Sequence, residues 1–81
     1  MLLRNVPKHP AYVVFHDAYD NGAMDVWPAA DLVGAQRIAT VQQQNLEDIG
    51  QDECGFYRAY TKLPRKKVYK FYSDLKETYH V

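Results

Sequence analysis

The sequence predicts one small α+β domain over residues 1–81, in which an antiparallel three-stranded sheet in ββαβ order packs against one long helix. Three observations predict this class: an Asn-Gly pair between two β-type runs, an amphipathic segment with cap residues at both ends, and a later segment of alternating side chains. A chain of 81 residues buries only about 60–65% of its unfolded surface, so its core is small. We therefore expect no bound cofactor.

The first two strands are expected to form a β-hairpin. The run Ala11–Asp17 is rich in β-branched and aromatic residues, and Asn21-Gly22 supplies the two positive-φ residues of a tight two-residue turn. The return strand covers residues 23–27, and the turn pairs Phe15 with Pro28. The favoured core face consists of Val13, Phe15, Tyr19, Met24 and Val26, and the alternative face consists of Tyr12, Val14, His16, Ala18 and Trp27.

A long helix is expected to follow the hairpin. Asp31 is a suitable N-cap, the helix runs to about Ile49, and Gly50 is a suitable left-handed residue just after its end. Its small residues Ala35 and Ala39 would let it lie close against a sheet. The expected inward arc consists of Leu32, Ala35, Ile38, Ala39, Leu46 and Ile49, joined only by Gln42.

The third strand is expected over Gly55–Leu63, where Tyr57, Ala59, Thr61 and Leu63 form the more apolar set and face the helix. The favoured interpretation after Pro64 is a C-terminal helix, because the apolar residues from Val68 to Tyr79 share one arc of a helical wheel. The alternative is a C-terminal hairpin strand that pairs with the third strand. Residues 68–72 prefer strands, and the cations at 65–67 would lie at the positive end of the helix dipole.

Charge is divided between two opposed blocks, although the formal net charge of the chain is zero. Residues 1–55 carry three basic and eight acidic side chains, and residues 56–81 carry seven basic and two acidic side chains. This asymmetry has three interpretations: the blocks cancel within the fold, they form an interaction surface, or they pair between copies in a homodimer.

No catalytic or metal-binding motif stands out, and we expect neither enzyme activity nor a metal site. Cys54 is the only cysteine and excludes an intrachain disulfide. The histidines, His9, His16 and His80, lack the spacing of a zinc site. The amino terminus lacks the apolar core of a signal peptide, and no run is long enough to span a bilayer. A cytoplasmic protein without a membrane partner is expected.

The segment Phe56–Tyr79 carries the functional hypotheses, because it holds seven of the eleven aromatic and seven of the ten basic residues. The favoured function is a small non-catalytic protein-interaction module, in which tyrosines anchor and cations steer an acidic partner. By analogy of size and architecture alone, phage-encoded or mobile-element inhibitors of host proteins, anti-CRISPR proteins among them, are examples of such modules. The alternative is an RNA or single-stranded DNA binder that uses the same surface. The expected binding residues are Tyr57, Tyr60, Arg65, Lys66, Lys67, Tyr69 and Lys70.

Overall fold

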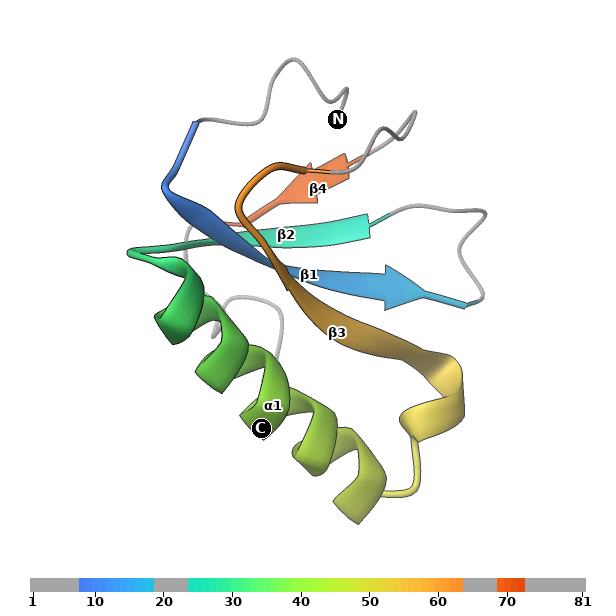
Figure 1. Ribbon diagram of the computed structural model, residues 1–81. Coiled ribbons are helices and arrows are strands. Elements are labelled where there is room, and N and C mark those ends of the chain that lie inside the picture. Colours follow the sequence, from blue (N-terminus) through green and yellow to red (C-terminus); the bar gives the residue numbers. More distant parts are fainter. Residues whose placement is uncertain (1–7, 19–23, 64–68, 73–81) are drawn as a thin grey trace.

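The computed structural model describes residues 8–18, 24–63 and 69–72, and shows one helix packed on a mixed four-stranded sheet (Figure 1). The elements, in chain order, are β1 (Ala11–Asp17), β2 (Met24–Ala29), α1 (Leu32–Asp48), the 3₁₀ turn η2 (Asp52–Cys54), β3 (Gly55–Tyr60) and β4 (Tyr69–Phe71). The strand order across the sheet is β3-β1-β2-β4. The predicted small α+β class is confirmed, but three antiparallel strands in ββαβ order do not describe this sheet, because β4 joins it parallel to β2.

The β1–β2 pairing exists, but its predicted register is wrong. Phe15 lies opposite Asp25, not Pro28, and Val13 lies opposite Trp27. The register therefore differs by three residues, and an odd shift moves the side chains of one strand to the other face of the sheet. Trp27 consequently joins Val13 and Phe15 on one face, and Met24 and Val26 join Tyr12 and Val14 on the other. The predicted turn residues Asn21-Gly22 lie outside the described residues.

The ends of α1 follow the local signals in the sequence. Asp31 caps the amino end, because its Oδ1 accepts a hydrogen bond of 2.7 Å from the Gly34 N–H. At the other end Gly50 has a φ of 71°, which a residue without a Cβ adopts at no steric cost. The N–H groups of Gly50 and Gln51 donate to the carbonyls of Glu47 and Leu46. These paired bonds form the Schellman arrangement that ends many helices.

The inward face of α1 is narrower than the sequence predicts. Ala35, Ala39 and Leu46 are buried as expected, but Leu32, Ile38 and Ile49 are exposed, with Ile49 at 64%. The reason is the placement of α1, which packs mainly over β3 and β1 and much less over β2 (Figure 1). Only the strip of α1 above those two strands is removed from water, so side chains at the border of the predicted arc stay outside.

Buried side chains lie on both faces of the sheet. Every residue of β1 from Ala11 to Phe15 is buried, as expected for a central strand flanked by β3 and β2. The cluster between the sheet and α1 contains Ala11, Val13, Phe15, Trp27, Ala35, Ala39, Leu46 and Tyr57. The cluster on the opposite face contains Tyr12, Val14, Met24 and Val26, with Tyr60, Leu63 and Phe71 packed against it. Leu63 therefore does not face the helix as predicted.

The segment after Pro64 enters the sheet, not a helix, where the structure describes it. Residues Tyr69–Phe71 form β4, so the C-terminal helix prediction is wrong for these residues. The alternative strand is correct in type, but β4 pairs with β2, with Tyr69 opposite Met24, and not with the third strand. The remainder of the predicted helix lies outside the described residues. Within the described part of the chain, α1 is too polar and too short to cross a membrane.

Candidate interaction surface

The predicted binding residues lie on strands at opposite edges of the sheet. Tyr57 and Tyr60 belong to β3, and Tyr69 and Lys70 belong to β4. Two strands separate β3 from β4, so these edges are about 14 Å apart at the usual strand spacing. Lys70 is exposed. The described members of the predicted set do not meet in one patch, and Arg65, Lys66 and Lys67 lie outside the described residues.

Tyr57 is a core residue. Its side chain is only 6% exposed and points toward α1. Its ring centroid lies 4.8 Å from that of Phe15 and 6.1 Å from that of Trp27. This packing agrees with the sequence prediction that Tyr57 faces the helix. It also means that the ring contributes to the core and not to an exposed anchor.

A different group of side chains gathers on the face of β3 that points away from α1. The residues Phe56, Arg58 and Tyr60 alternate with the inward Tyr57 and Ala59, and His16 joins them from β1. We call these four residues the β3 patch: His16, Phe56, Arg58 and Tyr60. Phe56 is 43% exposed.

The rings of the β3 patch are held in place by one another. Phe56 stacks on His16 with centroids 4.5 Å apart and planes 12° from parallel. The Nε2 atom of His16 forms a hydrogen bond of 2.8 Å with the Tyr60 hydroxyl. The guanidinium carbon of Arg58 lies 5.2 Å from the centroid of Phe56, within the range of a cation–π contact. An exposed aromatic ring is thus fixed between a histidine and an arginine.

Sequence reasoning included Tyr60 but missed His16, Phe56 and Arg58. Alternation along residues 55–63 places Phe56, Arg58 and Tyr60 on one strand face, but of these only Tyr60 was expected to bind. The stack itself depends on the β1–β3 register, which places His16 opposite Phe56 across 40 positions of sequence. No local signal reports that pairing.

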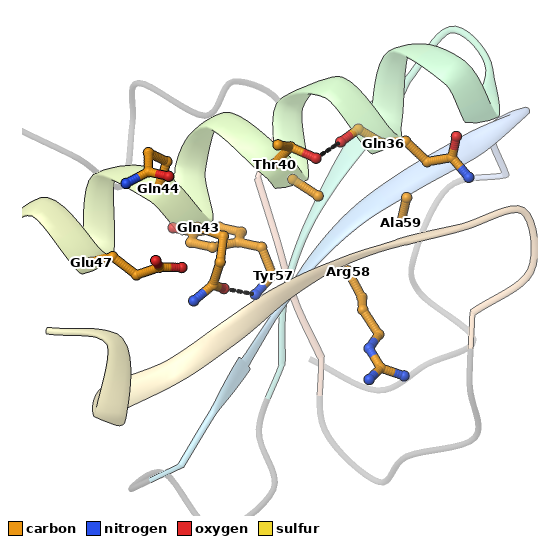
Figure 2. A pocket seen from close by; sticks show the side chains of 9 residues that line it. Gln36, Thr40, Gln43, Gln44, Glu47, Tyr57, Arg58 and Ala59 are labelled. Atoms are coloured by element: carbon orange, nitrogen blue, oxygen red, sulfur yellow. Dashed lines mark hydrogen bonds between the residues drawn. The ribbon is translucent and has the colours of Figure 1, made fainter.

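A groove of about 380 Å³ runs between α1 and the outer edge of β3 (Figure 2). Its lining combines polar side chains with Ala39, Ala59 and the ring of Tyr57. The lining residues are Gln36, Ala39, Thr40, Gln43, Gln44 and Glu47 from α1, and Tyr57, Arg58 and Ala59 from β3. In Figure 2 the side chain of Gln43 reaches down to the strand, where its Oε1 accepts a 3.0 Å hydrogen bond from the Tyr57 N–H.

The outer edge of β3 faces this groove. Because the Tyr57 N–H points to Gln43 and not to β1, alternation along the strand directs the backbone groups of Gly55, Tyr57 and Ala59 outward. Among the described residues β3 pairs only with β1 and forms one edge of the sheet. Such an edge can accept another extended chain.

Most of the described acidic residues gather at one end of the molecule, whereas Asp31 lies at the amino end of α1. Glu47 and Asp48 lie at the carboxyl end of α1, Asp52 and Glu53 lie in η2, and Asp17 lies opposite Gly55. Lys62 lies two residues after the other end of β3. In the part of the chain that the structure describes, Asp25 of the acidic block lies opposite Lys70 of the basic block on the neighbouring strands β2 and β4. The cations at 65–67, which decide whether the blocks cancel, are outside that part.

Comparison of the chain with protein-family models, with curated proteins and with solved structures gives no match. No group of three or more histidine, cysteine or acidic side chains within residues 8–18, 24–63 and 69–72 is arranged to hold a metal ion. The surface features above are therefore the basis for a functional proposal.

Proposed function

We propose that this protein is a small protein-interaction module that binds a partner protein through the β3 patch. The observation that carries the proposal is the exposed Phe56 ring, stacked on His16 and covered at one side by Arg58. Aromatic and arginine side chains dominate the energetics of protein interfaces. A ring that is already fixed loses little rotamer freedom on binding, so more of its burial energy contributes to affinity.

The chemistry of the patch favours a partner that is acidic around an apolar contact. Arg58 is exposed on β3, the strand that carries Phe56, and Lys62 is exposed two residues after the end of that strand. An arginine beside an aromatic ring can make a bidentate hydrogen bond to a carboxylate while the ring fills an apolar pocket. The charges would mainly accelerate encounter, and the Phe56 contact would mainly slow dissociation.

An inhibitor of the phage or mobile-element type is the specific role we favour for such a module. It needs no catalytic group, only a rigid surface that covers a functional site on a host protein. The analogy with anti-CRISPR proteins rests on size and α+β architecture, and the β3 patch supplies the surface that this role requires.

Single-stranded nucleic acid is the second candidate ligand, and the stacked Phe56–His16 pair with its adjacent arginine is the observation that favours it. Bases stack on such rings, and each stack contributes about 1–3 kcal/mol. The acidic residues Asp17, Asp52 and Glu53, close to the Phe56 end of β3, oppose a phosphate backbone there. We therefore rank this ligand below a protein.

The proposal is tested by affinity capture from cells of the source organism with matched variants. Phe56→Ala and Arg58→Ala should each weaken the captured interaction by about tenfold or more, the size of a modest hot spot. Val41→Ala is the matched control, because Val41 is an exposed apolar residue of α1 at 57% exposure. Equal capture by all variants would contradict the assignment of the surface.

Fluorescence anisotropy with labelled oligonucleotides at about 50 and 200 mM salt tests the second candidate, since affinity from several phosphate contacts falls by orders of magnitude over this range. Tight, salt-sensitive binding that is lost in Phe56→Ala would replace the protein partner by a nucleic acid.

A further inference from the structure

One flank of α1 carries exposed apolar side chains. Gln36, Gln43 and Glu47 line the groove beside β3, so they mark the β3 side of the helix. At about 100° per residue, Ile38 and Ile49 lie on the opposite flank. Because the strand order is β3-β1-β2-β4 and α1 packs mainly over β3 and β1, that flank faces the β2 side of the sheet. Ile38 is 37% exposed and Ile49 is 64% exposed.

The apolar arc of α1 is therefore wider than the strip that the strands cover. Ala35, Ala39 and Leu46 are buried, and the arc continues past them to Ile38 and Ile49. The apolar stripe of a helix normally faces a core, so its uncovered border indicates a further element beside α1. The place for such an element is above β2 and β4, over which α1 packs little.

The described chain ends at this place, with Tyr72. Its ring stacks on Trp27, with the two ring centroids 5.4 Å apart. Trp27 belongs to the buried cluster under α1 together with Ala35 and Ala39, the residues on either side of Ile38 along the helix. The chain therefore leaves β4 on the α1 side of the sheet, close to the part of α1 that contains Ile38.

We propose that residues 73–81 of the same chain cover this flank as a short helix that packs beside α1 and above β2. The sequence of the segment suits a helix, because Asp74 and Glu77 have the spacing of a capping box. Leu75 and Tyr79 are its two largest hydrophobic residues, and a separation of four places them on one face of a helix. That face packs on α1.

Chain length decides which part of α1 the segment reaches. Leu75 follows Tyr72 by three residues, so even a fully extended chain leaves it within about 10 Å of Tyr72. Ile49 lies eleven residues beyond Ile38, a rise of about 16 Å along the helix. Leu75 therefore contacts Ile38 and does not reach Ile49.

The covalent connection also selects residues 73–81 over a second copy or a separate protein as the occupant. A segment tethered by a short linker meets its site at an effective concentration in the millimolar range. A helix this short is marginal alone, and packing of its apolar face supplies the stability that it lacks.

The direct test is NMR spectroscopy of the purified full chain with labelled isoleucine and leucine methyl groups. Nuclear Overhauser effects are expected between the methyl groups of Leu75 and Ile38, and between the Tyr79 ring and α1. Their absence overturns the proposal. In a mixture of labelled and unlabelled chains, effects that arise only between chains assign the flank to a second copy and overturn it as well.

A double-mutant cycle in urea gives an independent test. Ile38→Ala and Leu75→Ala should each lower the urea midpoint of unfolding, and the double variant should lower it by less than the sum, because one contact is lost only once. Ile49→Ala is the matched control, since it removes the same side chain from the same flank beyond the reach of Leu75. Its loss should add fully to that of Leu75→Ala. Additive losses for Ile38→Ala and Leu75→Ala overturn the proposed contact.

This inference is independent of the partner protein proposed above, because the β3 patch lies on the face of the sheet away from α1. Leu75→Ala should leave capture of the partner protein unchanged, and Phe56→Ala should leave the Ile38–Leu75 coupling unchanged. Each proposal can therefore fail while the other stands.

Discussion

The two faces of the sheet are built differently, and the difference lies in how deeply their aromatic rings are buried. On the face covered by α1, the large rings of Phe15, Trp27 and Tyr57 fill the space under two alanines, Ala35 and Ala39. The small residues let the helix approach closely, and the rings occupy the volume that larger helix side chains would otherwise fill. Every member of this cluster is removed from water.

On the opposite face burial declines from the centre to the β3 rim. Val14 and Val26 are fully buried, whereas Phe56 at the rim is 43% exposed. The rim rings therefore contribute less to folding, yet they too are held, by the Phe56–His16 stack and by the His16–Tyr60 hydrogen bond. Order without deep burial is typical of a surface prepared for binding.

The largest expected effect comes from removing a ring on the α1 side. Trp27 is 2% exposed and stacks on Tyr72 at 5.4 Å, so Trp27→Ala should lower the free energy of unfolding by about 3–5 kcal/mol. Phe56→Ala removes a ring on the other face and should lower the free energy of unfolding by about 1 kcal/mol, which is what one exposed ring contact contributes. Urea unfolding followed by circular dichroism measures both.

Trp27→Ala could leave little folded protein, because the whole free energy of unfolding of a small domain is only about 5–15 kcal/mol. Trp27→Phe is the milder variant and keeps the comparison measurable. Equal losses for Trp27→Phe and Phe56→Ala would show that the two faces contribute alike to stability.

A smaller loss is expected where β3 crosses close to β1. A Cβ added at Gly55 would collide with the carbonyl oxygen of His16 and would lie 2.6 Å from Cζ of Phe15. The steric clash involves the backbone and a buried ring, neither of which can move freely. Gly55→Ala should therefore lower the free energy of unfolding by about 1–3 kcal/mol.

Gly34→Ala is the control for that substitution. A Cβ at Gly34 would lie 3.2 Å from Oδ1 of Asp31, the exposed cap residue, and alanine favours the helix by up to about 1 kcal/mol. These effects oppose each other, so the unfolding free energy should change by less than about 1 kcal/mol. A Gly34→Ala loss as large as that of Gly55→Ala would contradict the close approach of β3 to Phe15.

Features set by near neighbours in the chain could be predicted from the sequence. The caps of α1 depend on Asp31, Gly34 and Gly50, which lie within or next to the turns they stabilise. The β type of β1 and β3 follows from their residues. The burial of Ala35, Ala39 and Leu46 follows from helical periodicity.

Features set by distant pairings could not be predicted. The alternation of apolar and polar residues selects a register only when one face of a strand is polar, and β1 is buried on both faces. The predicted register of β1 and β2 therefore rested on Asn21-Gly22 alone. That register is wrong. The position of β4 beside β2 depends on contacts across more than forty residues. The Phe56–His16 stack has the same origin, which is why the candidate surface was recognised only in part.

An effect about the size of one hydrogen bond tests whether the β3 patch is ordered in solution. Tyr60→Phe removes only the hydroxyl that lies 2.8 Å from Nε2 of His16 and keeps the ring. One partly exposed hydrogen bond contributes about 0.5–1.5 kcal/mol to the unfolding free energy, so a loss of that size is expected. In a double-mutant cycle with His16→Ala the second substitution should cost almost nothing, because the bond is already lost. Additive losses would mean that the two side chains do not meet in solution. The pre-ordering of Phe56 by His16 would then have to rest on stacking alone, and the affinity advantage argued for the patch would shrink accordingly.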